Sequence, residues 1–363
     1  MTVDVKKIAN LKSVSLAGLL AGQADAIDDL VSSCKTYGFF YLDFQDPSTS
    51  GILKLVEQLS VIGKTVFKLP LEEKEEYSTE KYLPSRLLGY DVKTTYLCNS
   101  ANAIQLQASR MLCWAIFWKE RWLREFFGMG LSIGAHHTLT RISQIHNNGI
   151  FGEDAMIVPE EIDQNLALFK IFMGEVHGYT DCILSILSEA LQLPYDLKDC
   201  HRKDKPSSAN MAMLNYLPWG SSDERIGNMA HTDMGTLTVV FSKSDGLQAM
   251  LPGCDDWSFI PPKEGHAVVN VGDSLRFLSS GMLASSLHRV VPPPDSVGQD
   301  KFSVIYFLRP EFDAKFKDHD GKEINSVEWH NKKYSLFREA SLDAKTHGAM
   351  LTGRREYLGA TGA

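Results

Sequence analysis

The stretch NMAHTDMGTLTVV, residues 228–240, places a histidine and an aspartate two positions apart at the start of a β-branched run. Successive residues of a strand point to opposite faces, so we expect His231 and Asp233 to project to the same side while Thr232 turns away. The run that follows predicts a strand, because β-branched residues fit a pleated, half-buried surface. Two metal-binding side chains on one face form half of a site, and the remaining ligands must come from elsewhere in the chain.

Short apolar runs of the same kind continue beyond this stretch and before it. They are MAMLNYL, TLTVVF, GLQAML, HAVVNVG, SSLHRVV and FSVIYFL, and Gly, Pro, Asp and Ser separate them at close intervals. Several short strands spaced in this way predict a β-sandwich or barrel over the C-terminal part of the chain.

The N-terminal part has the 3.6-residue period of helices. Apolar residues recur at helical spacing over 23–37, Gly38 ends that helix, and FFYLDF follows as a buried strand. Further helices are predicted over 51–67 and 159–193, and the charged segment LPLEEKEEYS is expected to face solvent. The pattern indicates an α+β protein in which a helical N-terminal region packs against a strand-rich core.

One segment, residues 91–148, shows no stable period. Its central run MLCWAIFWKERWLREFF fits an amphipathic helix, a lid over a substrate or a poorly packed insertion, and periodicity does not choose among them. We therefore expect a helical and mixed region over 1–200 with an atypical segment at about 91–148, a strand-rich catalytic region over 201–310, and a polar C-terminal extension over 311–363.

Composition limits the classes of function. The 363 residues carry a net charge of −8, which argues against a nucleic-acid or anionic-membrane surface. The first residues lack the apolar core of a secretory signal, and no apolar run approaches the length of a membrane span. Six cysteines without CxxC pairs predict reduced thiols in a cytoplasmic protein and exclude a cysteine-rich zinc site. A monomer is the default expectation.

His288 is the strongest candidate for a third ligand, because it lies inside ASSLHRVV, a late strand of the predicted barrel. His266 starts a strand after KEG and is expected to be an exposed turn residue instead. Two imidazoles and one carboxylate on one face of a metal form the facial triad of non-haem iron(II) oxygenases, although zinc, manganese or cobalt would also fit. The alternative is a strand-end histidine and a turn aspartate that only satisfy backbone groups.

A second pair of polar residues follows in KFSVIYFLRP. Alternation puts Lys301 and Ser303 on one face of this strand, and an ammonium beside a hydroxyl is suited to hold a carboxylate. A lysine that points into a barrel without an anion is costly, so the alternative is an edge-strand lysine that reaches solvent. The triad and the carboxylate-holding pair are together more specific than either alone.

With these residues in order, the chain resembles the isopenicillin N synthase-like family of iron(II)- and 2-oxoglutarate-dependent dioxygenases. The motifs that carry the resemblance are NYLP, HTDMGTLTVV, GLQAM, VVNVGD, HRVVPP and KFSVIYF, with SCKTYGFFYLDF and KLPLEEKEEY in the N-terminal half. It extends over about residues 12–90 and 150–310. It implies a distorted double-stranded β-helix (jelly-roll) core, iron(II) held by His231, Asp233 and His288, and 2-oxoglutarate held by Lys301 and Ser303.

Two departures from the family pattern affect the cosubstrate site. The family usually has arginine at the position of Lys301, and a lysine offers a point charge instead of a rigid fork. Leu217 occupies the usual tyrosine position of the NxYP segment, although Asn215 and Tyr216 before it remain candidates for cosubstrate contacts. Phe307 and Met213 are candidates for the substrate pocket.

The resemblance implies oxidation of a small, fairly apolar secondary metabolite by iron(II), 2-oxoglutarate and dioxygen, with hydroxylation, desaturation or ring rearrangement as outcomes. Three alternatives remain at this point. They are an oxidase of the same fold that does not use 2-oxoglutarate, a zinc hydrolase with a metal-bound water, and a catalytically impaired binding homologue.

Overall fold

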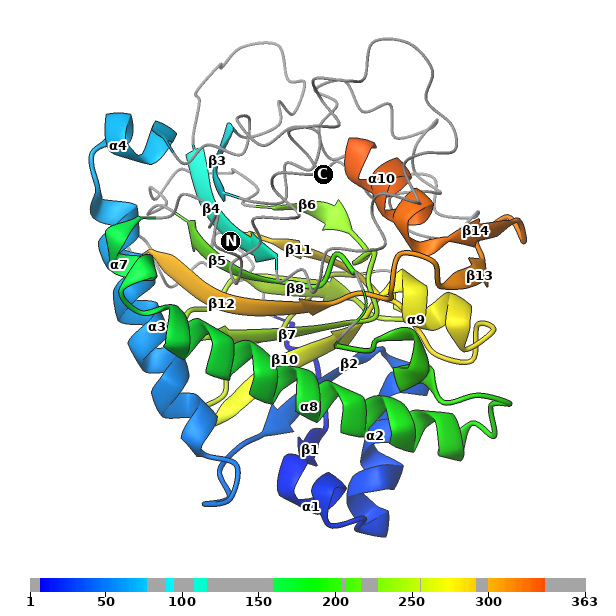
Figure 1. Ribbon diagram of the computed structural model, residues 1–363. Coiled ribbons are helices and arrows are strands. Elements are labelled where there is room, and N and C mark those ends of the chain that lie inside the picture. The colour runs from blue at the N-terminus through cyan, green and yellow to red at the C-terminus, as the bar shows by residue number, and fades with distance from the viewer. Residues whose placement is uncertain are drawn as a thin grey trace, which may run out of the picture.

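The computed structural model describes residues 7–76, 89–94, 108–115, 159–203, 205, 207–216, 228–254, 256–291 and 300–336. Two facing β-sheets form the centre of the molecule, and helices cover the outer face of the larger one (Figure 1). This is the double-stranded β-helix that the sequence predicts.

The larger sheet has eight strands in the order β1-β2-β10-β7-β12-β5-β4-β3. Except for the parallel pair β1 and β2, neighbouring strands run antiparallel. In the order of the sheet, the strands are Ser13–Ser15, Phe39–Asp43, His266–Val271, Leu237–Ser242, Lys301–Leu308, Asn210–Tyr216, Ala108–Ala115 and Gly89–Thr94. Strands β1 to β4 come from the predicted N-terminal region, so that region contributes half of this sheet in addition to the helices that cover its outer face.

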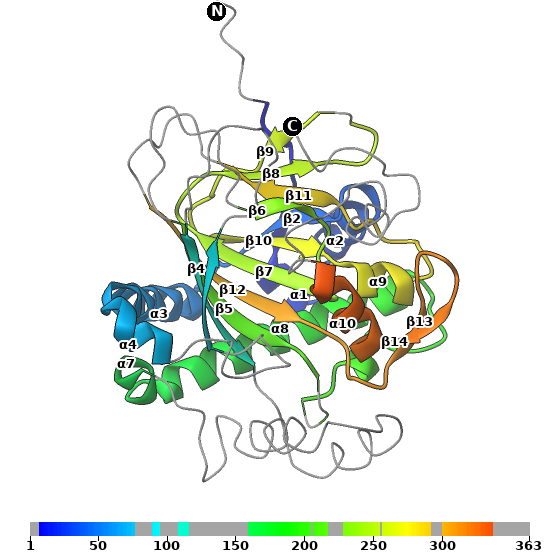
Figure 2. The same cartoon turned by 90° about the horizontal axis from the view of Figure 1, so that it is seen from above.

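The smaller sheet has the order β6-β11-β8-β9 and lies opposite the inner face of the larger one (Figure 2). Its strands are Asn228–His231, Leu287–Val290, Leu247–Met250 and Ser258–Phe259. A separate hairpin of β13 (Lys315–Lys317) and β14 (Glu323–Asn325) follows β12 along the chain.

The helices gather at the outer face and at one end of the barrel (Figure 1). They are α1 (Leu16–Leu20), α2 (Ala24–Thr36), α3 (Gly51–Lys68), α4 (Leu71–Glu76), α7 (Glu160–Asp163), α8 (Leu166–Ala190), the 3-10 helix η2 (Leu197–Cys200), α9 (Asp273–Leu278) and α10 (Ser326–Leu336). The predicted helix over 159–193 is therefore two helices, α7 and α8. None of the described helices has the length and apolar character that a membrane span requires.

Strand alternation separates the two sides of the large sheet. On β12, the side chains of Phe302, Val304, Tyr306 and Leu308 belong to the main apolar core, which also includes residues of α3 and α8. The alternate residues of the same strand, from Lys301 to Phe307, line a cavity between the sheets. This two-residue period puts the apolar half of β12 against the helices and leaves the other half for function.

The C-terminal extension differs from the expectation of a polar appendage. Within 311–336, Phe316, Ile324 and Trp329 are buried in the main core, and Trp329 packs edge-on against Phe277 at 5.1 Å. The sequence does not show this, because short strands and one helix with many charged residues supply only a few apolar groups each. Of the 91–148 segment, 91–94 and 108–115 are described as strand, which rules out a helix at the start of MLCWAIFWKERWLREFF. The rest of that segment lies outside the described residues.

Candidate active site

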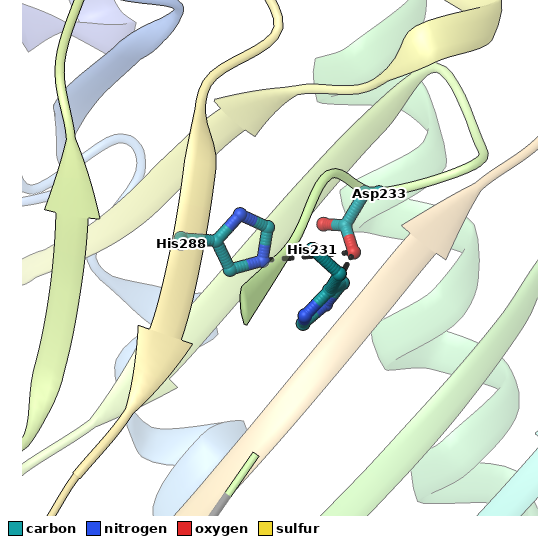
Figure 3. Close-up of side chains that lie close together, drawn as sticks. All are labelled: His231, Asp233 and His288. Atoms are coloured by element: carbon teal, nitrogen blue, oxygen red, sulfur yellow. Dashed lines mark ion pairs between the residues drawn. The ribbon is translucent and has the colours of Figure 1, made fainter. Parts of the chain in front are cut away.

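The strand register brings the two predicted histidines together. His231 is the last residue of β6, and His288 on β11 is its direct cross-strand partner. Asp233 follows two residues after the end of β6. The Nε2 atoms of His231 and His288 lie 3.5 and 3.7 Å from Oδ1 of Asp233 (Figure 3). Three potential ligand atoms, one from each residue, lie within 4.8 Å of one another.

Two side chains that the sequence analysis missed hold the aspartate in place. Thr238 donates a hydrogen bond of 2.6 Å to Oδ2 of Asp233, and Asn270 donates one of 2.7 Å to the same oxygen. Oδ2 is thereby occupied, and Oδ1 is the oxygen that faces the imidazoles. A sequence signal for Asn270 existed, since it is a polar residue within the apolar run HAVVNVG.

The protonation states of this cluster suit a divalent metal. Burial, and secondarily the neighbouring His231, lower the pKa of His288 to about 4. Its Nδ1 lies 3.2 Å from the carbonyl oxygen of Ser286, which favours a proton on Nδ1 and a lone pair on Nε2. Burial works to raise the pKa of Asp233, but the imidazoles and the bond from Asn270 outweigh it and hold the pKa well below its usual range. His288 is therefore a neutral nitrogen donor, and Asp233 is a carboxylate.

The three residues lie at one side of a cavity of about 790 Å³ between the two sheets, its open mouth included. Strands of both sheets contribute to its walls. The lining residues outside the triad include Leu214, Tyr216, Val240, Ser242, Leu247, His266, Val268, Asn270, Val290, Lys301, Ser303, Ile305 and Phe307.

Lys301 is a buried cation in this cavity, with 5% of its surface exposed. Its Nζ donates to the carbonyl oxygen of Ser244 at 2.8 Å and to Oγ of Ser242 at 3.3 Å, and both partners are neutral. The ion pairs among the described residues do not include it. Burial lowers the pKa of Lys301 to about 8, although Asp245 works in the opposite direction. A buried ammonium bonded to neutral oxygens indicates a place for a ligand carboxylate.

The strand register places this cation and Asp233 at different positions along β7. Ser303 pairs with Ser242 of β7, and Phe307 pairs with Thr238, which bonds Asp233. Thr238 and Ser242 are four residues apart, a rise of about 13 Å along the strand. Because Nζ of Lys301 bonds Ser242, its ammonium lies at the far end of this span from Thr238 and Asp233.

The weaker site predictions divide according to strand face. Tyr216 and Phe307 line the cavity. Met213 lies on the opposite face of β5 in the main core, where its sulfur approaches Gly63 of α3, so its prediction as a pocket residue was wrong. Asn215 shares that outward face because it alternates with Leu214 and Tyr216, so the structure contradicts its cosubstrate role. Leu217 lies outside the described residues.

The expectation that His266 is exposed was also wrong, whereas the expectation that it starts a strand is confirmed. It is the first residue of β10, it is buried, and its ring packs against Tyr41 while Nδ1 lies 2.7 Å from the carbonyl oxygen of Glu264. The preceding KEG suggested an exposed turn, but the strand pairing with Asp43 of β2 starts at this residue. His266 lines the same cavity as the triad, but it is not one of the three residues whose potential ligand atoms cluster together.

The donors fit the groups that the sequence implies. Two imidazole nitrogens and a carboxylate oxygen on one side of a metal suit iron(II) with open coordination positions, and the buried lysine suits a dicarboxylate. When bound, iron(II) and 2-oxoglutarate supply the activation of dioxygen that side chains lack.

Comparisons with known proteins agree with this geometry. Residues 208–310 match the 2OG-Fe(II) oxygenase superfamily, and residues 10–139 match the N-terminal region described as non-haem dioxygenase in morphine synthesis. The 2-oxoglutarate-dependent dioxygenase gloE of Glarea lozoyensis is 30% identical over 348 residues, which cover 95% of this chain and 93% of that protein. The 2-oxoglutarate-dependent dioxygenase frbH of Dothideomycetidae sp. is 30% identical, with 96% of each chain covered.

Solved structures share the fold. A 2OG-Fe(II) oxygenase family protein from Caulobacter crescentus has a TM-score of 0.67 at 20% identity, with 90% of this chain and 99% of that chain covered. The dioxygenase for auxin oxidation in rice has a TM-score of 0.58 at 17% identity, with coverages of 92% and 98%. The relatives decide against the oxidase, hydrolase and non-catalytic alternatives. The chain belongs to the 2OG-Fe(II) oxygenase superfamily and is an oxidoreductase that uses iron(II), 2-oxoglutarate and dioxygen.

Proposed function

We propose that His231, Asp233 and His288 bind the iron, and that Lys301 and Ser303 bind the distal carboxylate of 2-oxoglutarate. One observation carries the proposal. Two imidazole Nε2 atoms face one carboxylate oxygen in a cavity that also contains a buried lysine bonded to neutral oxygens.

Each residue has a defined task in this proposal. Thr238 and Asn270 fix Asp233 so that one oxygen faces the metal position. Lys301 neutralises the far carboxylate, and Ser303, which is 2% exposed, adds a hydroxyl donor beside it. The buried positions of His231, His288 and Lys301 keep the reacting groups away from bulk solvent, and the cavity walls orient the target C–H bond. Tyr216 is retained as a second candidate for the cosubstrate end, because it pairs with Lys301 across β5 and β12.

For the substrate, we propose a small, fairly apolar organic molecule of the secondary-metabolite type. The support is the apolar part of the wall formed by the large sheet, where Leu214, Val240, Ile305 and Phe307 line the cavity. Phe307 is the residue of this group that we assign to substrate contact, because its partner in the register is Thr238 beside the metal position. Hydroxylation is the default outcome, and desaturation or ring rearrangement uses the same site.

A monomeric state and a cytoplasmic location complete the proposal. Cys34, Cys182, Cys200 and Cys254 are free thiols, which supports a reducing compartment. Light scattering after gel filtration measures the molar mass in solution and so tests the monomeric state.

The direct test is formation of succinate from 2-oxoglutarate in air with added iron(II). The wild-type protein is expected to produce succinate slowly without a substrate, and His231→Ala and His288→Ala are expected to abolish it. His266→Ala serves as the matched control, because this histidine lines the same cavity but is not a member of the triad. Succinate formation at the wild-type rate by His288→Ala would refute the ligand assignment.

A further inference from the structure

A buried ion pair lies behind the candidate metal site and joins two distant parts of the chain. Lys333 belongs to α10, Asp273 is the first residue of α9, and the Nζ atom of Lys333 contacts Oδ2 of Asp273. Both side chains are fully buried, at 0% exposure. In Figures 1 and 2, α9 and α10 lie at the same end of the barrel, where β12 ends.

The pair is connected to the segment that carries His231 and Asp233. Thr232, between them, donates a hydrogen bond of 2.9 Å to Oδ2 of Asp273 and accepts one of 2.6 Å from Lys333. The backbone N–H of Asp273 also donates to the carbonyl oxygen of Asp233 at 2.8 Å. Thr232 therefore points away from the metal position, and its hydroxyl is fixed by both members of the pair.

Asp273 is also connected to the segment that carries His288. Ser285 donates a hydrogen bond of 3.0 Å to Oδ1 of Asp273. Ser285 stands three residues before His288 in the chain and is fully buried. The two carboxylate oxygens of Asp273 thus contact one ligand segment each.

The cost of burying this pair indicates that it has a specific task. Removing two charges from water costs several kcal/mol per ion, and hydrophobic residues of the same volume are often as stable or more so. Here the pair bonds the hydroxyl groups of Thr232 and Ser285, and these two residues belong to the segments that carry the candidate metal ligands. Contacts of this kind control how the metal ligands are oriented.

We infer that Lys333 and Asp273 are positioning residues for the metal site, through which the C-terminal helix α10 sets the relative placement of His231, Asp233 and His288. The inference rests on the proposed function for the identity of the ligands. It assigns to α10, which lies beyond the residues matched to the superfamily, a direct influence on metal affinity.

The test measures the dissociation constant of Co²⁺ for the metal-free full chain, by visible absorption, in four variants. Thr232→Val and Ser285→Ala each cut one link and leave the ion pair in place. The double variant Lys333→Met/Asp273→Asn removes both charges, so that no unpaired charge stays buried. Lys332→Met, an exposed lysine on the same helix, is the matched control. Thermal unfolding of each metal-free variant is recorded in parallel.

Outer contacts of metal ligands typically change affinity by roughly ten- to a hundredfold. We therefore expect the double variant and Thr232→Val to bind Co²⁺ at least about tenfold more weakly and with an altered absorption spectrum. Lys332→Met is expected to match the wild type. A purely structural pair would instead lower the unfolding temperature and leave the Co²⁺ affinity and spectrum of the folded protein unchanged.

The inference is overturned if Thr232→Val and Ser285→Ala both bind Co²⁺ within twofold of the wild type. These two variants keep the ion pair, so they decide the question even where the double variant does not fold. If the assignment of the metal ligands itself is wrong, the experiment gives a different result. In that case, His231→Ala and His288→Ala would themselves retain Co²⁺ binding.

Discussion

Replacement of Lys301 by methionine is expected to weaken 2-oxoglutarate binding without weakening the fold. The substitution keeps the apolar stem and removes the ammonium group that now bonds Ser242 and Ser244. Because burial lowers the pKa of Lys301 to about 8, keeping this group charged at neutral pH costs the folded protein free energy. Lys301→Met is thus expected to be at least as stable as the wild type.

The size of the binding effect follows from the contact that is lost. A hydrogen bond to a charged group contributes about 1.5–3 kcal/mol, and each 1.4 kcal/mol is about a tenfold change in affinity. The dissociation constant of 2-oxoglutarate should therefore rise about 10- to 150-fold. Isothermal titration of 2-oxoglutarate into protein loaded with Co²⁺ measures it directly.

Two further variants make this measurement decisive. Lys263→Met removes an exposed lysine that also lines the cavity, so it should leave the affinity unchanged. Lys301→Arg keeps the charge and should recover most of the binding. An affinity for 2-oxoglutarate in Lys301→Met within threefold of the wild type, at unchanged Co²⁺ affinity, would refute the role of this lysine.

Four other results are expected. Since the ammonium form of Lys301 binds the carboxylate and its pKa is about 8, the 2-oxoglutarate dissociation constant should be flat below pH 8 and rise up to about tenfold per pH unit above it; a flat titration curve from pH 7 to 9.5 would contradict this. Asn270→Ala removes a donor to Asp233 and should weaken Co²⁺ binding roughly ten- to a hundredfold, as read by visible absorption. Gly272→Ala places a Cβ 2.3 Å from the carbonyl oxygen of Gly235, and urea unfolding should show a loss of about 1–3 kcal/mol. Trp329→Ala should cost about 3–5 kcal/mol by the same measurement, whereas a loss under 1 kcal/mol would show that the C-terminal segment is not part of the core.

Much of the barrel was predictable because strands β2, β5, β7, β8, β10, β11 and β12 each have a strong local signature. The alternation in KFSVIYFL separates core from cavity residues without any knowledge of the partner strands, and the structure follows it. The pairing of His231 with His288 was predictable only through the HxD spacing and the resemblance to a known family. No local pattern states that β6 and β11 are neighbours.

What was missed depends on contacts between segments far apart in the chain. Met213 was a candidate for substrate contact, and Asn215 was a cosubstrate candidate from the family's NxYP segment, whereas the phase of β5 turns both outward. His266 resembled a turn residue because the sequence does not show where β2 begins to pair with β10. Lys333 contacts Asp273 and Thr232 across 60 and 101 positions of the chain, and nothing in a charged helix marks one lysine as buried.

The metal and cosubstrate assignment is tested most directly by anaerobic addition of iron(II) and then 2-oxoglutarate to the metal-free protein, followed by visible absorption. We expect a weak charge-transfer band that requires both additions, is absent in His231→Ala and His288→Ala, and persists in His266→Ala. Iron binding without the band would contradict the cosubstrate assignment at Lys301. A band of wild-type intensity in His288→Ala would contradict the assignment of His231, Asp233 and His288 as the iron site.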